Sequence, residues 1–155
     1  PPSHLGFYMG SITGAFLVGS FISNRLAKHT TSTKLVLAGR TISVLGLSLG
    51  LIIVMFGNVS SLSIFGSTLF IGLGNGMSLP SCYVGVMNVR SDLAGSAAGL
   101  SGAMGVAAGA ILATMMAAIL TENNAAFGFL SFLLVAKIIS LAGAILAHNL
   151  EKNIN

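Results

Sequence analysis

The chain has 155 residues, of which 54% are hydrophobic and only 6% are charged, and its formal net charge is +4. Soluble domains carry roughly 25% charged residues, so this composition excludes a soluble protein and predicts an all-α integral membrane protein. The few basic residues are spread along the chain and form no patch, which argues against a nucleic-acid partner. The chain starts at Pro1 and enters an apolar segment at once, as expected for part of a longer protein.

Five apolar stretches are long enough to cross a lipid bilayer as helices, which takes about 20 residues each. Their side chains do not alternate between polar and apolar as barrel strands would. The linkers between them are too short to hold another folded domain. We therefore expect one domain with transmembrane helices over residues 5–24, 35–56, 62–87, 93–120 and 127–147.

The positions of the basic residues predict the orientation in the membrane. The second and fourth linkers hold no lysine or arginine, and six of the seven basic residues fall on the opposite side. Because basic residues mark the cytoplasmic side of a membrane protein, the amino end is expected outside and the carboxyl end in the cytoplasm. The six residues are Arg25, Lys28, Lys34 and Arg40 in or just past the first linker, Arg90 in the third, and Lys152 in the tail.

The third expected helix contains a cluster of helix-breaking residues. Gly72, Gly74 and Gly76 precede Pro80, and proline removes a backbone hydrogen bond, so the helix is predicted to be bent or locally unwound there. In transporters such interruptions often mark the binding region. Asn75, near the middle of this helix, either faces a cavity or hydrogen-bonds a neighbouring helix, a contact typically worth about 0.6 kcal/mol.

The fourth expected helix is almost without bulky side chains. Its glycines fall within a third of the helix circumference, and two pairs have the GxxxG spacing of close helix contacts in membranes. We interpret this stripe as a packing surface. A nucleotide-binding loop would need a preceding strand and a lysine, and neither is present. The stripe consists of Gly95, Gly99, Gly102, Gly105 and Gly109.

Arg90 and Asp92 lie at the cytoplasmic boundary before this helix. They would either close an inner gate by pairing across two halves of a transporter or act as solvated anchors. Ser91 or Asp92 is the preferred cap of the glycine-rich helix, because both residue types accept hydrogen bonds from its first amides.

Lys137 places a formal charge at the centre of the fifth expected helix. A lysine there costs about 2.5–3.5 kcal/mol on insertion scales. It would line a substrate path, pair with an acid on another helix, or be held by carbonyls or water and neutralised by burial. No aspartate or glutamate falls inside any expected span, so a proton-coupling carboxylate would have to lie elsewhere in the parent protein.

Two motifs resemble the major facilitator superfamily. Pro80 followed by the run from Ala94 to Gly102 resembles the tenth and eleventh helices of its drug-efflux members, closest to the bicyclomycin-resistance type. The run from Ser20 to Lys28 resembles the cytoplasmic loop motif, with Arg25 and Lys28 at its basic positions, although Ser20, Asn24 and Ala27 depart from the pattern.

The resemblance implies that the chain supplies helices 8 to 12 of a multidrug efflux antiporter of the bacterial inner membrane. Such a protein works by alternating access and needs the missing amino-terminal half as a partner. Its substrate would be a small hydrophobic or cationic drug-like molecule. The candidates for its path are Asn75, Met77, Tyr83, Met104 and Lys137.

No nucleophile, base and orienting group converge, and no metal ligands cluster, so we expect no enzyme, metal or cofactor. A second hypothesis is a small membrane subunit or scaffold that docks a partner helix on the glycine stripe. A channel would need rings of polar pore residues, and the sequence has none.

Overall fold

A computed structural model describes residues 2–57, 60–89, 91–121 and 125–154, and within them the fold is all-α. Each of the five long helices is long and apolar enough to cross a membrane. The expected spans are confirmed to within a few residues at most ends, while the last helix runs further than expected. The elements are α1 (Pro2–Leu26), α2 (Ser32–Met55), α3 (Ser61–Val89), the short 3₁₀ turn η1 (Ser91–Leu93), α4 (Ala94–Ile119) and α5 (Ala125–Ile154).

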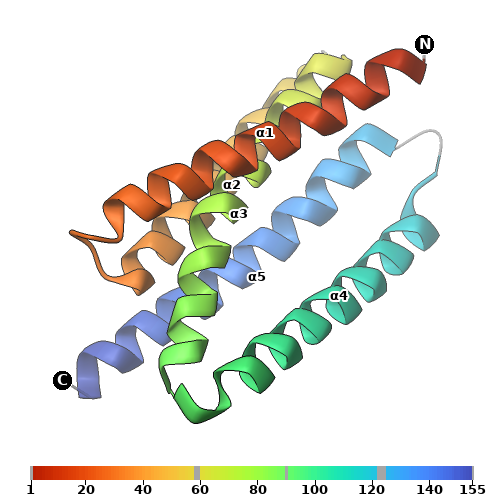
Figure 1. Ribbon diagram of the computed structural model, residues 1–155. Coiled ribbons are helices and arrows are strands. Elements are labelled where there is room, and N and C mark those ends of the chain that lie inside the picture. The colour runs from red at the N-terminus through yellow and green to blue at the C-terminus, as the bar shows by residue number, and fades with distance from the viewer. Residues whose placement is uncertain (1, 58–59, 90, 122–124, 155) are drawn as a thin grey trace.

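Helix α3 is the centre of the bundle. It packs along α1 on one side and along α2 on the other, and α5 packs against α2. Helix α4 turns back from the end of α3 and runs separately from the other helices, as Figure 1 shows. None of the described residues of α4 is buried. The chain therefore forms a four-helix unit with one helix standing apart.

Glycines bring α1 and α3 into backbone contact. A Cβ added at Gly72 would lie 2.5 Å from the carbonyl oxygen of Ile12. One added at Gly76 would overlap the carbonyl of Phe16, and one at Gly19 would overlap that of Leu73. Since association in lipid gains little from hydrophobicity, such close backbone approach supplies much of the attraction.

The contact between α2 and α3 is built in the same way. Gly39 lies against the backbone of Gly74, and Gly46 accommodates the ring of Phe70. Next to this seam, Leu47 of α2 and Leu130 of α5 are fully buried against each other's helices. The firmly packed part of the molecule is thus α1, α2, α3 and the first half of α5.

Helix α3 is continuous through Pro80 and is not unwound there. Figure 1 shows a bend in its carboxyl-terminal half, which is the other of the two predicted outcomes. The helix survives because proline removes only one backbone hydrogen bond and the neighbouring turns stay closed. Gly72 and Gly76, which the sequence marks as helix breakers, serve here as contact points for α1.

The start of α4 differs from the expected cap. The turn η1 takes up residues Ser91–Leu93, so Leu93 occupies the cap position and makes no side-chain cap hydrogen bond. The N-cap position is therefore Leu93 and not Ser91 or Asp92, while a hydrogen bond from the first amides of α4 to Asp92 stays a prediction. The physical reason is that the chain first closes a tighter 3₁₀ turn and enters the α-helix only at Ala94.

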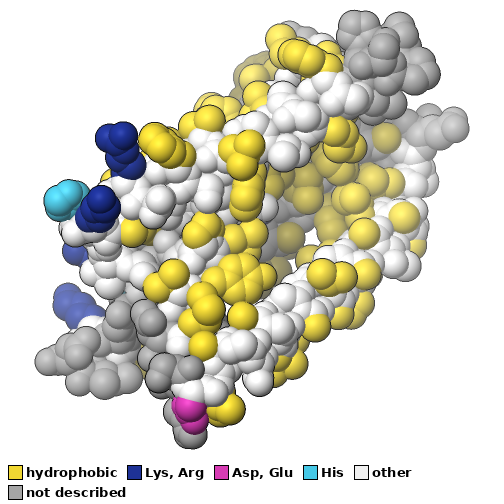
Figure 2. All heavy atoms as spheres, viewed as in Figure 1, with side chains coloured by type: hydrophobic (Ala, Val, Ile, Leu, Met, Phe, Trp, Pro, Cys, Tyr) yellow, Lys and Arg dark blue, Asp and Glu magenta, His cyan; other side chains and the backbone are white. Residues whose placement is uncertain are grey.

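The surface agrees with a lipid environment. Large apolar side chains are widely exposed, among them Phe7, Val106 and Ile139, and such extended apolar surface is not stable in water. Lysine and arginine side chains gather at the end of the bundle where the α1–α2 turn and the carboxyl terminus lie (Figures 1 and 2). We call this end the basic end.

Candidate functional site

The centre of the bundle holds a polar cluster made by three helices. The Nζ of Lys137 on α5 donates a hydrogen bond to Oδ1 of Asn75 on α3, at 2.7 Å. The Nη1 of Arg40 on α2 reaches the same oxygen at 3.5 Å. All three side chains are partly buried. We refer to Arg40, Asn75 and Lys137 as the cationic cluster.

Helical periodicity explains why these side chains meet. Lys137 lies two turns after Leu130 on the face of α5 that packs on α2, and Arg40 lies two turns before Leu47 on the matching face of α2. Residues spaced this way share one side of a helix. The lysine therefore points into the bundle and away from lipid.

The position of Arg40 corrects the sequence analysis. From the sequence, Arg40 was expected just past the first linker, with the basic residues that mark the cytoplasmic side. The structure places it inside α2, roughly 12 Å from the start of the helix at 1.5 Å per residue, where it reaches Asn75. Its location inside the expected span 35–56 was the available signal.

The apolar spans that carry the cluster contain no acidic residue to balance its positive charge. The only acidic residues in the sequence are Asp92, Glu122 and Glu151, and none of them falls within an apolar span. Two positive charges that reach the same oxygen lie close together and repel each other. A neutral amide oxygen separates the two cations and only partly offsets this repulsion.

A cavity of about 330 Å³ follows the same three helices toward the basic end. Its walls are small or apolar side chains, which leaves room between the helices. Thr33, Cys82 and Ala144 each lie two turns from Arg40, Asn75 and Lys137 on their respective helices, on the same faces. The lining residues are Ser32, Thr33, Val36, Ser81, Cys82, Gly85, Ala144 and Ala147.

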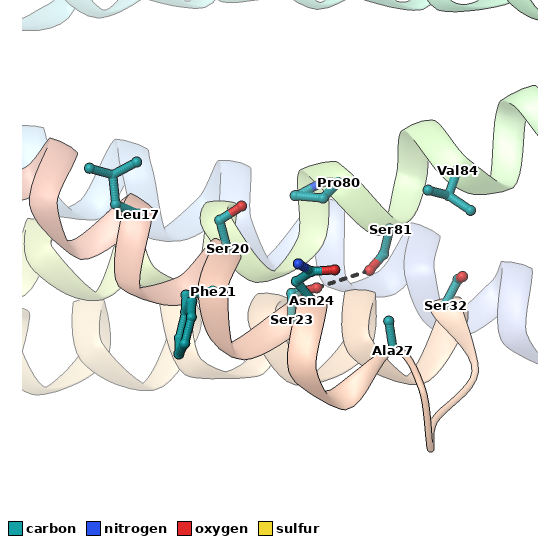
Figure 3. A pocket seen from close by; sticks show the side chains of 10 residues that line it. All are labelled: Leu17, Ser20, Phe21, Ser23, Asn24, Ala27, Ser32, Pro80, Ser81 and Val84. Carbon is teal, nitrogen blue, oxygen red and sulfur yellow. Dashed lines mark hydrogen bonds between the residues drawn. The ribbon is translucent and has the colours of Figure 1, made fainter.

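A second cavity, of about 410 Å³, lies where the loop motif meets Pro80 (Figure 3). Asn24 and Ala27 of the motif line it, together with Leu17 and Val84. Figure 3 shows the side chains of α1 on one side of it and those of α3 on the other.

Two buried serines link α1 to α3 at this cavity. The hydroxyl of Ser23 donates to the carbonyl of Met77 at 3.0 Å and lies 3.3 Å from the hydroxyl of Ser81. Both serines are buried. This link could not be predicted from the sequence, because serines are common in these helices and nothing distinguishes the two that face each other.

The basic residues of the loop motif point outward. Arg25 and Lys28 are exposed at the basic end, and the Arg25 guanidinium lies 5.2 Å from the centre of the Phe21 ring. They are placed as membrane-boundary residues, while Asn24 and Ala27 of the same motif face the cavity.

A third cavity, of about 470 Å³, opens at the opposite end, between α1, α3, α5 and the end of α4. Its walls are almost wholly apolar and include Met9, Phe65 and Phe129. Tyr8 stacks on Phe65 next to it, with ring centres 4.4 Å apart. Figure 2 shows the face of the molecule hollowed between α1 and α4, with hydrophobic side chains on both sides.

The remaining predicted path residues are scattered. Met77 is buried between the helices, with 6% of its surface exposed, and lines none of the three cavities described above. Tyr83 lies at the contact between α3 and α4, where its hydroxyl approaches Gly102. Met104 is exposed on α4. Only Asn75 and Lys137 of the predicted set come together.

The remaining predicted site residues lie at the start of α4 and along its glycine stripe. Asp92 is exposed in η1, and Arg90 lies outside the described residues. Among the described residues, no three His, Cys, Asp or Glu side chains group as metal ligands. Apart from Gly102, the glycines of the α4 stripe have nothing within 4 Å of an added Cβ in this part of the chain, so their packing role stays a prediction.

Comparisons with known proteins found no match to this chain. No protein family model, no curated protein and no solved structure matches the chain.

Proposed function

We propose that the chain is part of a membrane transporter, of the drug-efflux antiporter type of the major facilitator superfamily, which works by alternating access. The observation that carries the proposal is the contact between Lys137 and Asn75. Ionisable residues inside a membrane are costly and mark transport pathways by default. A purely structural bundle of this composition would have little reason to keep two cations at this depth.

The packing of the helices also supports transport. Alternating access needs rigid groups of helices that move against one another. Helices α1, α2 and α3 form such a group through glycine contacts, while α4 is free of the others over most of its length. In the proposed transporter, α4 contacts the missing helices, and the glycine stripe lets them slide.

The apolar cavity favours a hydrophobic substrate over a cationic one. Its aromatic and methionine side chains suit an apolar ring system. A cationic substrate would meet repulsion at the level of Arg40 and Lys137, because the apolar spans of this chain contain no acid. We propose the bacterial inner membrane as its location, with the basic end in the cytoplasm.

The test is dye efflux by the complete reading frame that contains this chain. Bacteria lacking their own efflux pumps would be loaded with Nile red, a neutral dye, or ethidium, a cationic one. We expect faster loss of Nile red than in cells with an empty vector. Residues 1–155 alone are expected to give no efflux. Unchanged retention of both dyes with the complete protein in the membrane would contradict the proposal.

A second function is favoured by one observation, the uncovered glycine stripe of α4. In this alternative the chain is a small membrane subunit that docks a partner helix on the stripe. Efflux by the complete reading frame would exclude it. Absence of efflux together with stable co-purification of another membrane protein, lost when Gly99 is replaced by leucine, would support it.

A further inference from the structure

The cationic cluster lacks the charge that would balance it. Arg40 and Lys137 converge on one neutral oxygen, and the chain has no acidic residue anywhere before Asp92. Buried charges in proteins are normally paired. A negatively charged group from outside the described helices would balance them.

The cavity beside the cluster indicates what kind of anion fits. None of the three cluster residues lines it: on α2 it begins at Val36, one helical turn from Arg40, and it continues to the basic end along α2, α3 and α5. Its walls near the cluster include Val36 and Ala144, and its far end carries the hydroxyl residues Ser32 and Thr33. A ligand with a charged head group at the cluster and an apolar body along Val36 and Ala144 would match these walls.

Two features of the cluster select the head group. The planar guanidinium of Arg40 matches the geometry of a carboxylate, and the Lys137 ammonium adds a point charge. A group of higher charge would be harder to remove from water at this depth. A monovalent carboxylate with a small apolar body is the ligand that these groups recognise.

The far end of the cavity also favours an anion. Exposed Lys28 and Lys34 lie at the basic end, where positive charge raises the local concentration of anions. Further along the same face of α5, the Nδ1 of His148 is buried and has no hydrogen-bond partner among the described residues. This nitrogen is available to a polar group that enters.

We propose that Arg40, Asn75 and Lys137 form a binding site for a small organic carboxylate, which enters from the basic end through the cavity lined by Cys82. The inference adds a ligand class to the proposed transport function. Its geometric argument does not depend on drug efflux, and its test measures binding without transport, so the two proposals can fail separately.

Cys82 provides a built-in probe, since it is the chain's single cysteine and lines the cavity. Its reaction with methyl methanethiosulfonate, a small neutral reagent, would be timed in the full chain reconstituted into lipid nanodiscs. Benzoate is expected to slow the reaction several-fold. Benzamide, which has the same shape without the charge, is expected to leave the rate unchanged.

Variants test whether the cations hold the ligand. Lys137→Gln and Arg40→Gln should each abolish protection by benzoate, while Arg40→Lys, which keeps the charge, should retain part of it. Decanoate tests the source of the carboxylate. Protection by decanoate but not benzoate would mean that the ligand comes from the bilayer.

Three results would overturn the proposal. The first is that neither carboxylate protects Cys82, and the second is equal protection by benzamide. The third is full protection in a folded Arg40→Gln or Lys137→Gln protein. The comparison of benzoate with benzamide needs no variant, so it stays decisive even where a variant fails to fold.

Discussion

The Nζ of Lys137 lies 2.7 Å from Oδ1 of Asn75 and so joins the centre of α5 to the centre of α3. Arg40 reaches the same oxygen from α2. One amide thereby links three helices that are far apart in the sequence. Its carbonyl oxygen accepts from both cations, which makes Asn75 the residue on which the cluster depends.

Replacing Asn75 tests this dependence with two substitutions of similar size. Asn75→Leu removes the acceptor from two partly buried cations and should destabilise the protein by about 1–3 kcal/mol. Asn75→Asp supplies a negative charge between them and should raise the unfolding temperature above that of the native chain. Thermal unfolding in detergent micelles measures both. Equal stability of the two variants would show that the cations do not depend on this position.

The glycine contacts predict a contrast between α3 and α4. Gly76→Ala would push a methyl group into the carbonyl of Phe16 and should cost about 1–3 kcal/mol, as overpacking does. Gly105→Ala is the matched control, because an added Cβ there has nothing within 4 Å. The control should be neutral or slightly stabilising, since alanine favours helix. Similar losses of stability in both variants would contradict the assignment of the α1–α3 contact.

The buried serine link is testable in the same way. Ser23→Ala removes the hydrogen bond to the Met77 carbonyl and should cost about 0.5–1.5 kcal/mol of unfolding free energy. The control is Thr114→Ala, whose hydroxyl is exposed and bonds only to the carbonyl of Ala110 in its own helix. A larger loss in the control would mean that the link does not join α1 to α3.

The glycine stripe of α4 makes a prediction about assembly. Gly99→Leu combined with Gly105→Leu should leave the unfolding temperature of residues 1–155 nearly unchanged, because an added Cβ at either position has nothing within 4 Å. In the complete protein the same pair should reduce assembly and dye efflux, measured by size-exclusion chromatography and Nile red loss. Full assembly and efflux of the double variant would contradict the interpretation of the stripe as a packing surface.

Hydropathy was sufficient to predict the five helices and most of their ends, because a membrane span needs a long apolar run whatever its partners are. Lys137 and Asn75 could also be singled out, since a polar residue at that depth is rare. Their contact with each other could not be predicted. It depends on the rotation of α3 and α5 about their axes, which is set by packing.

Arg40 shows why the rest of the cluster was missed. A basic residue near a helix end usually marks the membrane boundary, and only the contact with Asn75 reveals that this one turns inward. The glycines of α3 were misread for a related reason. The spacing of Gly72 and Gly76 is the same in a broken helix and in a helix that packs closely against another helix. Their contacts with the backbone of α1 show that close packing is the case here.

The most direct measurement is water access to the position of Lys137. A Lys137→Cys, Cys82→Ser protein would be treated in membrane vesicles with a membrane-impermeant thiol reagent applied at the basic end. The matched control is Ile139→Cys in the same background, because Ile139 lies at nearly the same depth on the lipid-facing side of α5, with 67% of its surface exposed. We predict reaction at position 137 and none at 139. No reaction at 137 from either face, or equal reaction at both positions, would contradict a water-accessible site in the centre of the bundle.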